Sequence, residues 1–150
     1  MNRKNPEKSE SYLPDTSRSL PIILMRARET VMAPIREMLS DSGITEQQWR
    51  ILRVLSECGP QNASDLARRA CILLPSLTRI SRSMIEKDHI KRAVETDDRR
   101  RYAVSITPKG QKIIDDNLPR AVEIATGYRA KLGEERFELL LDLLQELDES

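Results

Sequence analysis

The chain has 150 residues, of which 39% are hydrophobic and 3% aromatic, and its formal net charge is +1. This length allows one domain with a real core, or a small domain with an oligomerisation layer. Because aromatic residues are scarce, leucine, isoleucine and methionine must fill the core, which favours helices over a β-sandwich. No apolar run is long enough to span a membrane and the N-terminus lacks a signal-peptide apolar region, so we expect no membrane partner and a cytoplasmic location.

The scarcity of cysteine and histidine argues against metal and nucleophilic chemistry. Two cysteines and one histidine cannot form a four-ligand zinc site, so neither a metal nor another cofactor is expected. No nucleophile with a partner base can be identified, so the protein is not expected to be an enzyme. Cys58 and Cys71 are predicted to be small buried side chains.

The charge is unevenly distributed although its sum is close to zero. Residues 65–101 contain ten Lys and Arg against six Asp and Glu, a net charge of +4. Residues 111–150 contain five against ten, a net charge of −5. A basic middle and an acidic C-terminal part indicate that one end of the protein meets a polyanion and the other end does not.

The first predicted elements are a tail and a helix. Residues 1–18 have no hydrophobic periodicity and are predicted to form a flexible tail. Apolar residues then follow helical spacing from about Leu20 to Leu39. We expect Pro34 to kink this helix and Gly43 to end the element.

The second helix has a strong start signal. Thr45 and Gln48 match a capping box, and Ile44 and Trp49 are spaced as a hydrophobic staple. The helix is expected to end at about Cys58, because a Gly-Pro pair follows.

Two shorter helices follow, and the second of them has two different faces. Asn62 is placed to cap a helix over 63–70, and Pro75 suits the first position of the next helix because it lacks an amide hydrogen. The spacing predicts a core face and an opposite face whose side chains reach base edges and phosphates. The core face holds Leu77, Ile80 and Met84, and the outer face holds Arg79, Arg82 and Glu86, with Thr78 and Ser83 at its sides.

A two-stranded ribbon is predicted after this helix. His89 stands where such a helix normally ends on a left-handed glycine, and we expect it to take that conformation. Two alternating runs, 90–95 and 102–106, are then expected to pair around a charged loop that cannot enter a core. A ribbon beside an amphipathic helix is typical of a wing beside a DNA recognition helix.

The loop itself carries a basic cluster. Asp98 and Arg100 are two residues apart, so an extended loop would project both to one side and let them pair. Such a pair would restrain the guanidinium before it enters a narrow, electronegative minor groove. Arg99, Arg100 and Arg101 repel one another unless a polyanion neutralises them, so a DNA contact is favoured over a solvated charge run.

The C-terminal part is predicted to be helical and dimeric. Thr107 and Pro108 mark the start of a long helix that Pro119 should bend or break and that Gly133 closes. The last helix carries an apolar stripe that is too broad for one small domain to cover, so we favour a dimer built from both ends of the chain over an ordinary core helix. The stripe consists of Phe137, Leu139, Leu140, Leu141, Leu143, Leu144 and Leu147.

The order of these parts is that of a winged helix-turn-helix. Four segments together resemble the MarR family of transcriptional regulators, and the first two resemble especially the subgroup that regulates homoprotocatechuate degradation operons. The likeness extends over residues 20–148. The segments are 45–50 (TEQQWR), 70–78 (ACILLPSLT), 98–100 (DRR) and 107–110 (TPKG).

The resemblance implies a fold, a partner and DNA-contacting residues. The fold would be mostly α with a two- to three-stranded antiparallel wing. Residues 44–106 would form the DNA-binding domain, and residues 19–43 and 107–150 would form the dimerisation region. The partner would be a two-fold, pseudo-palindromic DNA operator with half-sites about one helical turn, ~34 Å, apart. Carried over by position, Ser76, Thr78, Arg79 and Arg82 would face the major groove, and Arg100, held by Asp98 and flanked by Arg99, would enter the minor groove.

The resemblance also implies a small aromatic acid or phenolic effector that reduces operator affinity. Such an anion needs a cation and a flat apolar wall, which Arg26, Arg28, Trp49 and Arg50 would supply. The simpler alternative is that Trp49 is only the staple and that the arginines pair with nearby carboxylates. Two other functions stay open: an oxidant sensor of the same fold that uses Cys58 or Cys71, and a winged-helix protein-interaction module that does not bind DNA.

Overall fold

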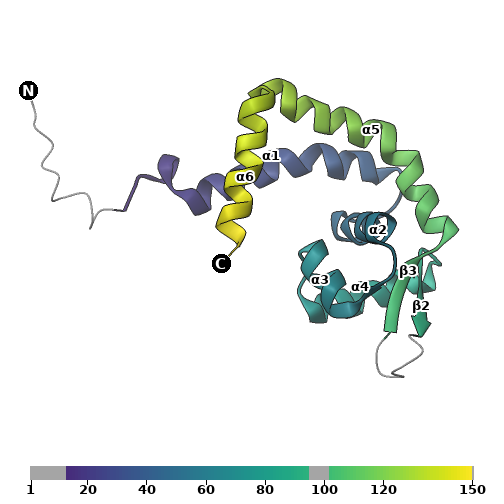
Figure 1. Cartoon of the computed structure of the whole chain (residues 1–150). Helices are drawn as coiled ribbons and strands as arrows, with labels where there is room; N and C mark the ends of the chain where they lie inside the picture. Colours follow the sequence, from purple (N-terminus) through teal and green to yellow (C-terminus); the bar gives the residue numbers. More distant parts are fainter. Residues whose placement is uncertain (1–12, 95–101, 150) are drawn as a thin grey trace, which may run out of the picture. The chain divides into compact units, whose positions relative to one another are not determined.

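The fold is mostly helical with one small antiparallel sheet, as predicted. The computed structural model describes residues 13–94 and 102–149. The chain divides into two units, Met1–Pro34 and Ile35–Ser150, and the boundary falls inside the first long helix. In chain order the described elements are η2 (Thr16–Arg18), α1 (Leu20–Ser40), α2 (Glu46–Cys58), β1 (Gln61–Asn62), α3 (Ala63–Ala70), α4 (Leu74–Glu86), β2 (Ile90–Val94), β3 (Tyr102–Ile106), α5 (Pro108–Leu132) and α6 (Glu134–Asp148) (Figure 1).

Three helices of the second unit begin at the polar caps that the sequence predicts. Thr45 and Gln48 form the complete capping box of α2, with bonds of 3.1 and 3.0 Å. Asn62 accepts from the backbone N–H of Asp65 at the start of α3. Thr107 accepts from the backbone N–H of Gly110 at the start of α5. Each cap satisfies an N–H group that has no partner inside its helix.

The sheet has three strands in the order β1-β3-β2, and both pairings are antiparallel. In the predicted ribbon, Ile90 pairs with Ile106 and Val94 pairs with Tyr102. Residues 95–101, and with them the predicted contacts Asp98, Arg99 and Arg100, lie outside the described residues. The same holds for residues 1–12 of the predicted tail.

The core lies between the short helices, the sheet and the start of α5. Helix α2 packs against α3, α5 and β3, while α4 packs against α3 and β2. Ile44 and Trp49, the predicted staple, are both buried. The most deeply buried large side chains are Leu39, Ile51, Leu52, Leu55, Leu66, Leu77, Met84 and Ile90.

Several helix ends differ from the prediction. Helix α4 begins at Leu74, one residue earlier than expected, so Pro75 occupies its second position, where a missing N–H is equally harmless. At the other end, Asp88 rather than His89 is left-handed, with a φ of 59°. The N–H groups of Asp88 and His89 bond to the carbonyls of Ile85 and Met84, the two bonds of a Schellman motif.

Neither proline ends its helix in this structure. Pro34 lies inside α1, and Pro119 lies inside α5, which is one continuous helix over 25 residues. A proline removes one hydrogen bond of the helix ladder. Inside a helix of this length the remaining bonds keep the element together, so the predicted alternative of a break at Pro119 is wrong.

The start of α5 is held against the turn between α4 and β2. Thr107 Oγ1 donates to the Asp88 carbonyl at 2.6 Å, and Lys109 Nζ donates to the Lys87 carbonyl at 3.0 Å. Gly110 lies so close to this turn that a Cβ would overlap the His89 carbonyl oxygen and lie 2.9 Å from Ile106 Cγ1. Glycine at this position therefore permits a backbone contact that no other residue allows.

Helix α6 buries no residue within the described chain. Its leucines at 139, 140, 141, 143, 144 and 147 are all exposed. At its start, Arg129 of α5 lies 4.6 Å from the centroid of the Phe137 ring and pairs with Glu134 and Glu138. No helix of the described residues is long and apolar enough to cross a membrane.

Gly110→Ala should destabilise the protein by about 1 to 3 kcal/mol, because the new methyl group forces the α4–β2 turn and α5 apart. Gly127→Ala is the matched control. It lies inside the same helix, and a Cβ there would have no heavy atom within 4 Å. The control should gain about 0.5 to 1 kcal/mol from helix propensity alone. Urea unfolding measures both, and an equal effect of the two changes would contradict the close contact.

His89 should make the stability of the protein depend on pH. Burial, reinforced by Lys109 and Lys87 and opposed by Asp88, lowers the pKa of His89 below its ordinary value of 6.5. The unfolded chain therefore takes up a proton at a higher pH than the folded chain. The free energy of unfolding should then fall as the pH drops below about 6.5. Urea unfolding at pH 8 and about pH 5.5 measures this loss; if His89→Gln shows the same loss, other groups cause it.

Candidate functional site

The outer face of α4 is exposed as the sequence predicts. Thr78, Arg79 and Arg82 are exposed and Ser76 is half-buried, whereas Leu77, Ile80 and Met84 on the opposite face are buried. Arg79 and Arg82 are thus available to an external partner. One helix face fixes α4 to the domain and the other presents two guanidinium groups, which match the phosphates and base edges of DNA.

The turn that leads into α4 is held in one conformation. Cys71 is left-handed, with a φ of 55°, and the N–H groups of Cys71 and Ile72 bond to the carbonyls of Arg68 and Ala67. Arg50 of α2 adds a bond of 2.7 Å from Nε to the Ala70 carbonyl. These bonds fix the direction in which α4 leaves α3, as a helix-turn-helix requires.

Arg50 has a structural contact that the sequence does not reveal. Its guanidinium donates to the carbonyls of Ala70 and Cys71 at the end of α3. A cation at a helix C-terminus stabilises both the unpaired carbonyls and the helix dipole. Arg50 does not line the cavity beside Trp49, because adjacent helix residues point about 100° apart.

Trp49 lines a cavity of about 460 Å³ between α2 and α5. Arg53 follows Trp49 by one helical turn and therefore projects from the same face of α2. The cavity thus combines an indole wall with a guanidinium group, the pair of features that was assigned to Trp49 and Arg50. Its other lining residues are Ser56, Glu57, Gln111, Ile114, Asp115, Leu118, Ala121, Val122 and Ala125.

Arg26 and Arg28 belong to the other unit of the chain. Both lie on α1 within Met1–Pro34, and both are exposed. The cavity lies wholly within Ile35–Ser150. Their predicted contact with an effector therefore stays a prediction.

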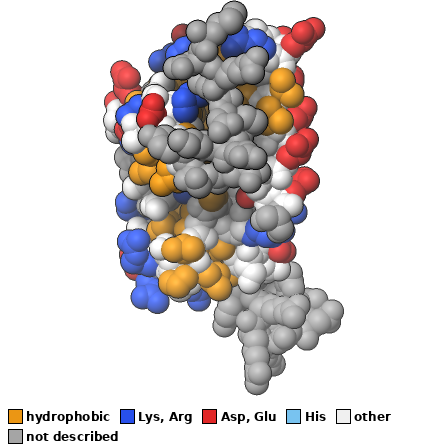
Figure 2. Space-filling view, turned by 90° about the vertical axis from the view of Figure 1, so that its left-hand side faces the viewer, with side chains coloured by type: hydrophobic (Ala, Val, Ile, Leu, Met, Phe, Trp, Pro, Cys, Tyr) orange, Lys and Arg blue, Asp and Glu red, His pale blue; other side chains and the backbone are white. Residues whose placement is uncertain are grey.

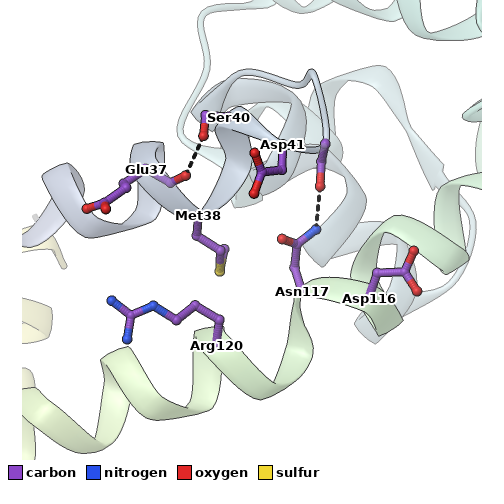
Figure 3. Close-up of a pocket in the computed structure, with 8 residues that line it drawn as sticks. Glu37, Met38, Ser40, Asp41, Asp116, Asn117 and Arg120 are labelled. Carbon is purple, nitrogen blue, oxygen red and sulfur yellow. Dashed lines mark hydrogen bonds between the residues drawn. The ribbon is translucent and has the colours of Figure 1, made fainter.

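A second cavity, of about 620 Å³, is polar (Figure 3). It lies between the end of α1 and α5, and Asn117 Nδ2 donates to Ser42 Oγ there at 2.8 Å. Three carboxylates line it, from Glu37, Asp41 and Asp116. Its one lining cation, Arg120, pairs with Glu123 at 3.2 Å. The charged residues of this cavity sum to −2, whereas Glu57, Asp115 and Arg53 of the α2–α5 cavity sum to −1. The α2–α5 cavity also has an indole wall and more apolar lining, so it suits an aromatic anion better.

Both cysteines are exposed, so the prediction that they are buried is wrong. Cys58 ends α2, and its Sγ lies 3.8 Å from an Arg69 guanidinium nitrogen. Cys71 occupies the left-handed position at the end of α3. Both lie at helix ends, where the chain turns at the surface, so neither side chain reaches the core.

The described residues thus form a winged helix-turn-helix, the fold of a DNA-binding transcriptional regulator. The MarR family model matches residues 44–102. A curated relative, the HTH-type transcriptional regulator FarR of Neisseria gonorrhoeae, is 39% identical over 86% of this chain and 88% of its own length. The chain belongs to the MarR family, and its relatives are transcriptional regulators rather than enzymes.

Two further relatives carry names that bear on ligands. The homoprotocatechuate degradative operon repressor of Escherichia coli is 37% identical over 85% of this chain and 86% of its own length. The solved structure of NadR in complex with 4-hydroxyphenylacetate is 37% identical and has a TM-score of 0.80. The match covers 91% of this chain and 99% of that structure.

Proposed function

We propose that this regulator is a homodimeric repressor that binds a two-fold DNA operator and that a small aromatic carboxylate weakens this binding. The exposed face of α4 carries the proposal, because Arg79 and Arg82 stand on a helix whose opposite face is fixed in the core. The α3–α4 turn holds that helix in a defined direction. Under this proposal α4 enters the major groove, and Ser76 and Thr78 lie beside the arginines.

The wing would contact the neighbouring minor groove. Strands β2 and β3 extend to Val94 and Tyr102, where the charged loop begins. In the proposed complex Arg100 would enter the minor groove and Asp98 would restrain the Arg100 side chain. Arg99 would contact the DNA phosphates. Residues 44–106 would be the DNA-binding domain.

The dimer would form from both ends of the chain, residues 19–43 and 107–150. The exposed leucines of α6 supply the apolar surface that a stable interface needs. Leu20, Ile23 and Leu24 on α1 are exposed as well. Two copies would present two α4 helices to two half-sites, which gives the operator its two-fold symmetry.

The effector would bind in the cavity between α2 and α5. Its carboxylate would pair with Arg53, and its ring would lie against Trp49 and the apolar residues of α5. Two relatives support this ligand class: the repressor named for homoprotocatechuate degradation and the NadR complex with 4-hydroxyphenylacetate. Arg26, Arg28 and Arg50 remain the other candidate cations.

The structure offers a route from this cavity to α4. A ligand between α2 and α5 changes how these two helices pack, and the start of α5 is bonded to the α4–β2 turn through Thr107 and Lys109. A shift of α5 would therefore move the end of α4 and the wing together. The effector would reduce operator affinity to the extent that it prefers the shifted arrangement.

DNA binding should depend steeply on salt and on Arg82. A duplex selected from a random pool should bind wild-type protein more weakly as salt rises from about 50 to 200 mM. Arg82→Ala should weaken binding and reduce the salt slope by about one unit per subunit, since one phosphate contact is lost. Arg120→Ala, on α5, should change neither. Failure of the wild type to select any duplex would refute the DNA-binding proposal.

Titration calorimetry with 4-hydroxyphenylacetate and with homoprotocatechuate tests the effector. The wild type should bind at least one of them, and Arg53→Gln should weaken that binding by about 10- to 100-fold, the effect of losing a charged hydrogen bond. Arg120→Gln, in the polar cavity, is the matched control and should bind normally. Arg28→Ala tests the cation on α1. Absence of heat with every hydroxylated aromatic acid would remove the effector from the proposal.

A further inference from the structure

Two leucines are exposed at the start of α4. Leu73 is 79% exposed and Leu74 is 46% exposed. Leu73 is also the N-cap residue, and its side chain makes no capping hydrogen bond. Leucine is one of the poorest N-cap residues, because it has no oxygen to accept from the first N–H groups of the helix. Capping therefore does not explain Leu73, and Leu74 is too exposed to be a core residue.

The neighbouring helices are capped differently. The N-cap residues of α2, α3 and α5 are Thr45, Asn62 and Thr107, and each of these side chains accepts a backbone hydrogen bond. Helix α6 follows Gly133, which has no side chain that could cap it. Among the described helices of the second unit, α4 alone has an apolar side chain at its N-cap. A polar N-cap stabilises α2, α3 and α5, whereas Leu73 gives α4 no such bond. This departure indicates that Leu73 serves function rather than stability.

Leu74 shares one face of α4 with two polar residues. Leu74, Thr78 and Arg82 are four residues apart, and Thr78 Oγ1 donates to the Leu74 carbonyl at 3.2 Å. Successive residues at this spacing lie one above the other on a helix. The exposed stripe therefore runs from an apolar end at the N-terminus of α4 to a cationic end. Figure 2 shows one face of the molecule, on which orange hydrophobic and blue basic side chains lie next to each other.

We infer that Leu74, with Leu73 beside it, contacts the 5-methyl group of thymine in the major groove of each half-site. This inference rests on the proposed DNA-binding function. In helix-turn-helix proteins the N-terminal residues of the recognition helix contact base edges, and the thymine methyl is the apolar group that the major groove exposes. The stripe also carries Arg82, whose positive charge is attracted to the phosphates of a DNA duplex. An apolar protein partner would not require this charge, so DNA is the favoured partner.

Deoxyuridine tests the contact, because it differs from thymidine only by that methyl group. The thymines of a duplex selected by the wild-type protein are replaced one at a time, and affinities are measured at constant salt. At one or two positions in each half-site the wild type should bind about fourfold more weakly, the effect of one lost methyl contact. Leu74→Ala should bind the thymine and uracil duplexes equally at those positions.

Arg82→Ala is the control, since it should weaken binding to both duplexes and keep the ratio between them. Leu74 is exposed, so circular dichroism should show an unchanged fold in Leu74→Ala. Two results would overturn the inference without affecting the proposed DNA binding. One is a wild-type affinity that no replacement changes, and the other is a Leu74→Ala protein that keeps the fourfold ratio between thymine and uracil duplexes. If no duplex is selected, the proposed function fails and this inference fails with it. A Leu74→Ala protein of changed sedimentation would assign the leucines to self-association and also overturn it.

Discussion

The contact between the start of α5 and the α4–β2 turn is the constraint on which the domain depends. Gly110 lies against the His89 carbonyl so closely that only glycine fits. Thr107 and Lys109 add hydrogen bonds to the carbonyls of Asp88 and Lys87. Through this junction α4, the ribbon of β2 and β3, and α5 are joined at one point. Motion of any one of them must therefore be shared by the others.

The same junction explains why the sequence places a threonine, a proline, a lysine and a glycine in that order. Thr107 caps α5 with its hydroxyl oxygen and donates the hydroxyl hydrogen to the turn. Pro108 takes the first helical position, where no donor is needed. The four residues together connect the start of α5 to the α4–β2 turn.

Much of the fold could be predicted because its signals are local. The capping box at Thr45, the caps at Asn62 and Thr107, and the two strands of the ribbon all depend on residues near in sequence. Strand β1 has only two residues, too few to show alternation, and it exists because Asn62 pairs with Ala103 across the sheet.

The misses have a common physical cause, which is that they depend on contacts distant in sequence. Periodicity shows which α2 residues share a face but not what lies opposite, so it did not reveal that Arg50 donates to the Ala70 carbonyl or that Arg53 lines the cavity beside Trp49. The left-handed residue after α4 is Asp88, and His89 next to it is buried, which the sequence pattern did not reveal. Exposure of Cys58 and Cys71 likewise follows from where the chain turns rather than from their neighbours.

The exposure of helix α6 bears on how much of the protein is folded at low concentration. A helix of 15 residues that buries none of them within its own chain gains little packing energy from that chain. In the proposed dimer its order would be supplied by association, and by mass action its folded population would follow the protein concentration in the cell. The abundance of the regulator would thereby help to set how much of it is competent to act.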